Sequence, residues 1–415
     1  MVAADSRNAP IRQRSLRTHN LGLVLRHVAA SARPVSRADV AAATGLTKAT
    51  VSTLVDELLA GSLLTEVDPA PRTKAGRPAI GLRLAAQGPA GLGLEVNVDY
   101  LAACVVDLTG QVRHRDLRTG DYRGSDPAAV LHEVAEIART AIEVAEGVGL
   151  TVAGTTLAVP GLVAGGIVRL APNLDWHNVD VRALLGKRLP HQRLEVENEA
   201  NLAALGELHA LPDDDRASFL YISGEIGVGS GIVLDGELFR GARGFGGELG
   251  HVTIRPDGPH CRCGSRGCLE AYANQDALLR NAGEPSVARL VAVARAGAHA
   301  ALMVLEEAGS AIGVAAADVV NLLDVETVVL GGIYAPLAPW LSEPVAREIS
   351  ERALATAWAP VTVRASVLGD TATVVGAAGS VIRALELEPS GGSSARMIRM
   401  STNAPDASTS STTGK

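Results

Sequence analysis

Two runs of apolar residues with helical spacing, separated by a short capped segment, lie near the start of the chain. The first run repeats every three or four residues and consists of Leu21, Val24, Leu25 and Val28. Pro34 ends this pattern, and Ser36 followed by Asp39 predicts the capped start of a second helix. This second helix is expected to be short, because Thr44-Gly45 is typical of a helix end.

The second apolar run predicts a helix that begins after Thr47 and stops at Gly61. Its buried stripe is predicted to contain Val51, Leu54, Val55, Leu58 and Leu59. Two short helices joined by a tight glycine turn predict a helix-turn-helix, whose second helix enters the major groove of DNA. The outward face carries small polar groups and one cation, which suit contact with base edges. These DNA-facing residues are Thr47, Lys48, Ala49, Thr50, Ser52 and Thr53.

A pair of strands is predicted after this helix, from Leu63 to Val67 and from Ile80 to Leu84. The tip between them carries Arg72, Lys74 and Arg77, the last between a glycine and a proline that keep the chain slim. The pair is therefore predicted to form a wing that reaches into the minor groove, where the negative potential is greatest. The alternative interpretation is a helical hairpin used for protein contact, with a solvated basic loop.

The distribution of charge separates this basic module from the rest of the chain. Residues 1–88 contain 12 Lys and Arg against 6 Asp and Glu, whereas the other residues contain 26 against 39. Because an acidic surface is repelled by phosphate backbones, the basic segment alone is expected to contact double-stranded DNA. Four further arginines either add phosphate contacts or belong to a solvated arm, and these are Arg7, Arg12, Arg14 and Arg17.

The pattern changes to strands from Gly91 onward, and strands then alternate with helices. Helices are predicted from about Pro127 to Glu146 and between about Val287 and Leu323. The strands are Gly91 to Val98, Leu101 to Asp107, Gln111 to Leu117, Thr155 to Val159, Phe219 to Ser223, Gly231 to Leu234 and Val328 to Gly332. Two α/β lobes are the simplest account, with ligands expected in the cleft between them. No secretory signal or membrane span is predicted, so the expected location is the cytoplasm.

Three of the four cysteines lie within eight residues of one another, which favours a metal site over a disulfide framework. Cys261, Cys263 and Cys268, with His251 ten residues before the first, supply the four ligands of a tetrahedral zinc ion. Because these four protein ligands leave no position for water, a structural Zn²⁺ is predicted. The alternative is three reduced, buried cysteines beside a histidine. Cys104, alone in an apolar strand, is expected to be a core residue.

The segment from Glu248 to Glu270 resembles the signature of the ROK family of repressors, open reading frames and sugar kinases. The matching motifs are Glu248-Leu249-Gly250-His251 and Cys261-Arg262-Cys263-Gly264-Ser265-Arg266-Gly267-Cys268-Leu269-Glu270. The resemblance extends from about residue 12 to 386. It implies an α/β protein in which a winged helix-turn-helix, like that of the xylose-regulator type, precedes a two-lobed actin/hexokinase-like (RNase H-like) ATPase fold. Because family kinases normally lack the DNA-binding module, its presence favours the regulator branch.

The resemblance also implies a set of side chains that hold sugar hydroxyls in the cleft. Carboxylates and amides suit this role, because they pair with neighbouring hydroxyls and an unmatched buried polar group is costly. The implied residues are Asn173, Asn198, Glu199, Glu248, His251 and Glu270. His251 is assigned to the metal and to the sugar together, since one ring nitrogen can bind zinc while the other faces the ligand.

Three positions that family kinases need are altered in this chain. The first phosphate loop, Asp-x-Gly-Gly-Thr in the kinases, is replaced by residues 95–99, which put Glu95 and Asp99 beside the expected polyphosphate. The second phosphate loop has Glu225-Ile226 where the kinases resemble Gly-Thr. The position of the catalytic base carries Glu199 in place of Asp, which is one methylene longer. The sequence therefore predicts no kinase activity. The alternative is a ROK sugar kinase that phosphorylates a hexose with ATP while a metal ion masks the carboxylates.

The predicted organisation is a winged helix-turn-helix over residues 12–87, a first lobe over 88–200, a second lobe with the zinc site over 201–387 and a disordered tail over 388–415. The predicted function is a sugar-responsive, DNA-binding transcriptional repressor of carbohydrate-utilisation genes. Its expected partners are double-stranded operator DNA and a small-molecule sugar effector, with no membrane. A homodimer or homotetramer is expected, because one helix-turn-helix reads too few bases.

Overall fold

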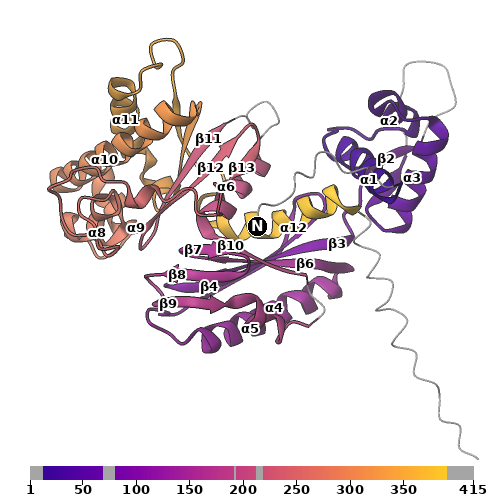
Figure 1. The fold of residues 1–415 in the computed structure, drawn as a ribbon, viewed down its shortest axis with the longest axis horizontal. Coiled ribbons are helices and arrows are strands. Elements are labelled where there is room, and N and C mark those ends of the chain that lie inside the picture. Colours follow the sequence, from indigo (N-terminus) through magenta and orange to yellow (C-terminus); the bar gives the residue numbers. More distant parts are fainter. Residues whose placement is uncertain (1–12, 69–79, 191–192, 212–217, 390–415) are drawn as a thin grey trace, which may run out of the picture. The chain divides into compact units, whose positions relative to one another are not determined.

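The computed structural model describes residues 13–68, 80–190, 193–211 and 218–389. These residues form two compact units. The first contains the described residues up to Pro89 together with those from Arg383 onward, and the second runs from Ala90 to Ile382. Figure 1 shows the helices and strands that make up each unit.

The first unit begins with α1 (Gln13–Ala29), α2 (Arg37–Thr44) and α3 (Lys48–Ala60). The predicted capping box is present at the start of α2: the Ser36 hydroxyl accepts a hydrogen bond from Asp39 N, and the Asp39 carboxylate accepts one from Ser36 N. α2 ends at Gly45, whose φ of 72° favours glycine. Thr47 caps α3 by accepting a hydrogen bond from Thr50 N at 3.2 Å. The predicted helix-turn-helix is confirmed.

The apolar stripe of α3 faces the other two helices. Four of its five predicted residues are buried, namely Val51, Leu54, Val55 and Leu58. Leu59 is only half-buried, because it lies at the edge of the stripe, one helical step beyond Leu58.

A two-stranded antiparallel sheet follows α3, formed by β1 (Leu64–Val67) and β2 (Gly81–Leu84) with Leu64 opposite Leu84. A backbone bridge from Val35 to Leu82 fixes this hairpin to the segment before α2. The predicted strand pair is confirmed. The wing tip, with Arg72, Lys74 and Arg77, lies outside the described residues.

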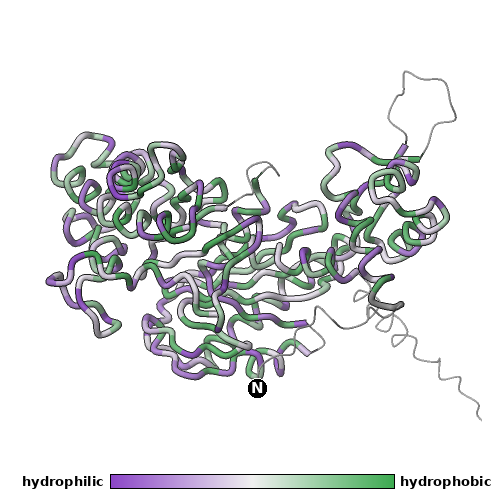
Figure 2. The backbone as a smooth tube through the Cα atoms, turned by 45° about the horizontal axis from the view of Figure 1, so that its top comes forward, coloured by the Kyte–Doolittle hydropathy of each residue, from purple (hydrophilic) through white to green (hydrophobic). Residues whose placement is uncertain are grey.

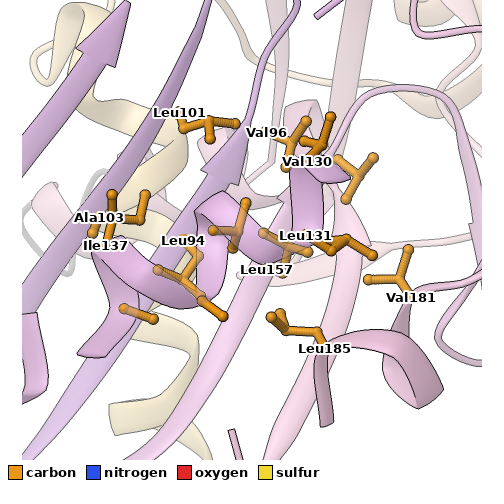
Figure 3. Packing of buried hydrophobic residues seen from close by; sticks show 14 of the residues in the cluster. Leu94, Val96, Leu101, Ala103, Val130, Leu131, Ile137, Leu157, Val181 and Leu185 are labelled. Atoms are coloured by element: carbon orange, nitrogen blue, oxygen red, sulfur yellow. The ribbon is translucent and has the colours of Figure 1, made fainter. Parts of the chain in front are cut away.

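The second unit contains two lobes, each built on a five-stranded sheet. The first sheet has the strand order β10-β6-β3-β4-β5. Its strands are β3 (Gly88–Val96), β4 (Tyr100–Asp107), β5 (Val112–Thr119), β6 (Leu150–Val159) and β10 (Leu194–Asn198). β3, β4 and β5 form an antiparallel meander, whereas β10 runs parallel to β6. Figure 3 shows Leu94 and Leu157 of this sheet packed against Leu131 of α4 (Pro127–Gly147).

A smaller antiparallel sheet and a short helix complete the first lobe. They are β7 (Leu162–Ala164), β8 (Ile167–Ala171), β9 (Trp176–Asp180) and α5 (Val181–Gly186). Trp176 is fully buried, and its indole donates a hydrogen bond to Ser125 O at 3.1 Å. This anchor fixes the turn between β8 and β9, which carries Asn173.

The second sheet has the order β13-β12-β11-β14-β15, with a meander of β11, β12 and β13 followed by the parallel strands β14 and β15. Its strands are β11 (Phe219–Gly224), β12 (Val228–Leu234), β13 (Glu237–Phe239), β14 (Thr327–Gly332) and β15 (Thr362–Ala365). The two lobes therefore repeat one arrangement, as expected. Central strands such as β4 and β11 are buried along nearly their whole length, as strands covered on both faces should be, and Figure 2 shows how hydrophobic and hydrophilic segments alternate along the chain.

Helices follow the second meander and pack on its sheet. They are η3 (Leu249–His251), α7 (Glu270–Ala273), α8 (Gln275–Ala282), α9 (Val287–Arg295), α10 (His299–Leu323), α11 (Tyr334–Arg352) and η4 (Gly369–Thr371). By length and composition alone α10 is apolar enough to cross a membrane, but 56% of its most apolar window is buried inside this protein. Its residues Leu305, Ile312 and Ala316 belong to the hydrophobic core of the second lobe, so a core helix accounts for its composition.

Two helices, α6 (Glu199–Ala210) and α12 (Ala372–Leu387), join the lobes. α6 packs Ala203 and Leu208 on the second sheet. α12 packs Val374 and Ala378 against β4 of the first sheet, where Cys104 is fully buried as predicted. The two helices touch through their backbones, because a methyl group on Gly376 would lie 1.9 Å from Leu202 O of α6.

Candidate functional site

The surface of α3 that is predicted to face DNA lies on its exposed side. Thr47, Lys48, Ala49 and Thr53 are exposed, and Thr50 and Ser52 are half-buried. No described residue forms an ion pair with Lys48, so its charge is available to a phosphate or a base. Because the hydroxyls of Thr47 and Thr50 lie 2.9 Å apart, the N-terminal turn of α3 presents a fixed polar edge.

The acidic residues at the far end of α3 are neutralised within the unit. Arg37 pairs with Asp56 and with Glu66, each at 2.8 Å. Arg17, for which the sequence suggests a phosphate contact or a solvated arm, pairs with Glu57. These pairs remove charges that would repel DNA. The contacts of Arg72, Lys74 and Arg77 with a minor groove stay predictions, because these residues lie outside the described part of the chain.

The four predicted metal ligands come together in the second lobe. One ligand atom from each of His251, Cys261, Cys263 and Cys268 lies within 4.8 Å of the other three. The Sγ atoms of Cys263 and Cys268 are 3.8 Å apart, and Cys261 Sγ lies 3.8 Å from His251 Nδ1. Sulfurs about 2.3 Å from a tetrahedral ion would lie about 3.8 Å from each other. The arrangement therefore fits a tetrahedral metal ion.

The loop between His251 and Cys268 is folded tightly around this cluster. Gly264 and Gly267 have φ values of 93° and 65°, which side chains rarely adopt. A methyl group on Gly267 would also lie 1.6 Å from Arg255 O. Glycine at these two positions therefore lets the backbone fold tightly around the four clustered residues.

The predicted sugar residues Glu199, Glu248, His251 and Glu270 lie near one another. Burial raises the pKa of Glu248, His251 opposes the rise and Glu270 adds to it. Burial, followed by the charge of Glu248, raises the pKa of Glu199 to about 7. Because Glu199 can therefore carry a proton near neutral pH, it can donate as well as accept hydrogen bonds with sugar hydroxyls.

The metal cluster and the sugar residues are in direct contact. Glu270 begins α7 two residues after Cys268, and its Oε1 atom lies 3.8 Å from Cys261 Sγ. Its Oε2 atom accepts a hydrogen bond from Val228 N at 3.3 Å. His251 directs Nδ1 toward Cys261, so the other ring nitrogen is not needed for the metal. The metal loop therefore orients two of the predicted sugar residues.

The two predicted asparagines differ in their surroundings. Asn173, from the first lobe, lies beside Glu270, because a methyl group on Gly227 would come within 3.4 Å of Asn173 Nδ2 and 2.7 Å of Glu270 Oε2. Asn198 caps α6: its Oδ1 atom accepts from Ala200 N and Asn201 N, and its amide donates to a backbone carbonyl. Asn198 therefore has a structural role that positions Glu199, the next residue.

The two altered phosphate loops meet at a small cavity. Its lining includes Glu95 of the first loop, Glu225 of the second and Glu199 at the start of α6. Burial, followed by the charge of Glu199, raises the pKa of Glu95 to about 8. Burial also raises the pKa of Glu225 well above its usual range. When one of these carboxyls is ionised, a phosphate about 4 Å from it would lose about 4 kcal/mol at an effective dielectric constant near 20, whereas a protonated carboxyl does not repel it.

Three further residues at these sites were not identified from the sequence. Tyr100 donates a hydrogen bond to Glu95 at 2.8 Å, and Asp370 lines the same cavity from a distant segment. Arg262, between the first two cysteines of the metal loop, donates to Asn173 Oδ1 at 3.3 Å. The position of Arg262 inside the metal motif was the available signal. Neither Tyr100 nor Asp370 belongs to a recognisable motif.

Comparison with known proteins defines the class of this chain. The model of the ROK family matches residues 91–384, and that of the IclR helix-turn-helix domain matches residues 21–68. The chain belongs to the ROK family. A crystal structure of a ROK family transcriptional regulator, a homologue of the Escherichia coli MLC protein, has a TM-score of 0.77 and 26% identity, covering 92% of this chain and 99% of the other.

Relatives of known name place the chain among the regulators of this family. The xylose repressor of Caldicellulosiruptor bescii is 29% identical over 84% of this chain and 92% of its own length. The xylose repressor of Bacillus subtilis is 28% identical over 84% and 91%. The glucokinase of Thermotoga maritima is 33% identical, but over 60% of this chain and 84% of its own length. Because similarity to the repressors extends over more of the chain, the protein is a xylose-repressor-like transcriptional regulator of the ROK family. Kinases of the same family are also related to it.

Proposed function

We propose that this protein is a repressor of carbohydrate-utilisation genes that releases operator DNA in response to a sugar and has no kinase activity. One observation carries the proposal. A cluster of carboxyls suited to sugar hydroxyls adjoins two phosphate loops that now carry Glu95 and Glu225. A kinase needs both halves of this cleft, whereas a sensor needs the sugar half alone.

The proposed effector is a neutral monosaccharide that contacts Asn173, Glu199, Glu248, His251 and Glu270. The similarity to proteins named xylose repressors makes xylose the first candidate. Three nearby glutamates disfavour an anionic sugar unless they are protonated. Asn198 would act on the sugar through the position of Glu199, because its own side chain caps α6.

The proposed metal is one structural Zn²⁺ held by His251, Cys261, Cys263 and Cys268. The spacing of these ligand atoms supports this assignment, and four protein ligands would fill a tetrahedral shell and leave no position for water. When bound, zinc would supply no chemistry. It would hold the Glu270 and His251 side chains in the orientation that faces the cleft, because these residues lie at the two ends of the metal loop.

The proposed mechanism is a shift between two arrangements of the lobes. Sugar binds one arrangement more tightly and favours it, and this changes the spacing of two DNA-binding units in a homodimer or homotetramer. The coupling is reciprocal, so operator DNA must weaken sugar binding by the same factor. The protein would act in the cytoplasm, where its DNA and sugar are both present.

The test combines a mobility shift on the protein's own promoter region with a thermal-shift screen of sugars. A sugar that stabilises the protein should also dissociate the DNA complex. The same preparation, given ATP and a panel of hexoses, should produce no ADP above the buffer rate. Specific DNA binding that no sugar alters would refute the sensor, and steady ADP production would favour the kinase suggested by the similarity to glucokinases.

A further inference from the structure

Two carboxyls from different lobes face one cavity of the second unit. Glu95 comes from β3 of the first lobe and is 2% exposed. Glu225 comes from the turn between β11 and β12 of the second lobe. Both line the same space, whose volume of about 10 Å³ is room for about one water molecule. The two lobes therefore approach each other through acidic side chains.

A second observation indicates that this cavity has a small polar occupant. The Ser223 side chain also lines it and is 8% exposed. Among the described residues, the Ser223 hydroxyl has no hydrogen-bond partner. Because this hydroxyl borders the cavity and has no partner among the described residues, a water molecule in the cavity is expected to form a hydrogen bond with it.

The charges around the two carboxyls do not compensate them. Arg115 lies near Glu95 but pairs with Asp370 at 3.8 Å, and Arg123 pairs with Asp99 at 2.8 Å. The ionisable groups that act on Glu95 are Glu199, Tyr100, Arg115 and Asp370. Those that act on Glu225 are Glu199, Glu95, Asp99 and Asp370. The charge of Glu225 in turn contributes to the raised pKa of the Tyr221 and Tyr334 phenols. The acidic groups therefore outnumber the bases, and each base already has an acidic partner.

We propose that this cavity is a proton-binding site that locks the two lobes together. Glu95 and Glu225 occupy it as neutral carboxyls in the closed arrangement, with one water molecule and the Ser223 hydroxyl bridging them. When the carboxyls lose their protons, their repulsion separates the lobes. This inference does not require that the cleft bind a sugar.

A proton suits the cavity better than a metal ion does. Among the described residues, the group whose ligand atoms lie close enough to hold a metal is the His251 cluster, and the three glutamates do not form such a group. Tyr100 already donates to Glu95 Oε1 at 2.8 Å, which fixes one oxygen of that carboxyl. Burial, the largest cause, together with the charge of Glu199 raises the pKa of Glu95 to about 8, in agreement with a proton held there at neutral pH.

The sign of the pH dependence follows from this shift. The pKa of Glu95 is raised from 4.5, the value of a glutamate exposed to water, to about 8 in the folded protein. Its contribution to stability is fully present below about pH 4.5 and is lost as the pH rises through about 8. Within that window, each proton that only the folded form retains makes the unfolding constant rise about tenfold per pH unit. Glu225 acts in the same direction.

The test compares the full chain with Glu95→Gln and Glu225→Gln, which keep the shape of the carboxyl but cannot ionise. Urea unfolding is followed by tryptophan fluorescence between pH 5 and 9. All three tryptophans, Trp176, Trp340 and Trp358, lie in the second unit, so the signal reports that unit. Glu146→Gln, at an exposed position of α4, is the matched control.

The wild type and Glu146→Gln should lose stability as the pH rises, and each cavity variant should flatten this loss. Identical pH profiles for the wild type and both cavity variants would overturn the proposal. Stabilisation of the wild type at pH 8 by MgCl₂ alone, absent in Glu95→Gln, would also overturn it in favour of a cation. If one variant does not fold, the other gives the profile. The infrared band of a protonated carboxyl at pH 7, weaker after either substitution, is an independent measure of the proton.

Glu199 belongs both to this cavity and to the predicted sugar cluster, so the lock has a consequence that does rest on the proposed function. Sugar binding should change the number of bound protons, and its calorimetric heat should differ between buffers of different ionisation enthalpy. Equal heats in the two buffers would show that the lock is not coupled to sugar. No heat in either buffer would contradict the proposed function, while the unfolding profiles would still decide on the lock.

Discussion

The contact between α6 and α12 can be tested with two glycines of α12. Gly376 lies at the contact, where a side chain would not fit, whereas Gly379 lies outside it. Gly376→Ala would place a methyl group 1.9 Å from Leu202 O and 2.7 Å from Gly206 N. Gly379→Ala, three residues further along the same helix, would meet a single described atom within 4 Å, His209 Nδ1 at 3.4 Å. The pair therefore separates the steric effect from the effect of alanine on the helix itself.

The magnitudes can be worked from this geometry. Alanine in place of glycine favours a helix by about 0.8–1 kcal/mol at either position. At Gly376 the two backbones must move apart by more than 1 Å, and overpacking costs about 1–3 kcal/mol, or more where backbone atoms are involved. Gly379→Ala should raise the free energy of unfolding, and Gly376→Ala should lie about 1–3 kcal/mol below Gly379→Ala. Urea unfolding followed by tryptophan fluorescence measures this difference in the second unit.

Equal stabilisation by the two substitutions would refute the reasoning, because it would mean that the backbones of α6 and α12 are not in contact. A shift of the unfolding midpoint with an unchanged denaturant slope would show that stability, and not compactness, has changed. Since α12 packs Val374 on β4 while α6 packs on the second sheet, a forced gap at Gly376 should also loosen the two lobes.

Three further predictions concern the metal and the DNA-binding unit. The purified protein should contain one zinc ion per chain, and Cys263→Ser should lose it while Cys104→Ala keeps it; equal zinc content in both variants would exclude the assigned ligands. Thr47→Ala should destabilise the first unit by about 1 kcal/mol through loss of the α3 cap, and Thr47→Ser should restore most of this, as thermal unfolding would show. Lys48→Ala should weaken operator binding and lower the salt slope by about 1, whereas Lys187→Ala, in the second unit, should not.

The parts of the fold that were predicted correctly from the sequence depend on local interactions. Ser36, Asp39 and Thr47 cap helices through neighbours three residues away, and Gly45 ends α2 by its own conformation. The clustering of the four predicted metal ligands also follows largely from local sequence, because three of the four lie within one short loop. Strands such as β4 and β11 were predicted because a continuous apolar run is typical of a strand buried on both faces.

The parts that were missed depend on contacts between distant segments. Asp370 reaches the cavity from the segment before α12, and no local pattern connects it to Glu95. The cap that Asn198 forms on α6 is a local interaction, and the predicted contact of Asn198 with a sugar stays a prediction. Leu59 was predicted to be buried because the apolar periodicity indicates which side of the helix faces the core. It does not indicate how wide the covered face is, and Leu59 lies at its edge.

The most direct test of the proposed function is the dissociation constant of the operator complex, measured with and without the sugar that stabilises the protein most. The sugar should weaken DNA binding by at least tenfold in the wild type, and Glu270→Gln should bind DNA normally but lose this response. ATP with magnesium should change neither value. An operator affinity that no sugar alters, or that ATP alters while ADP is produced, would contradict the claim that this cleft senses sugar without phosphorylating it.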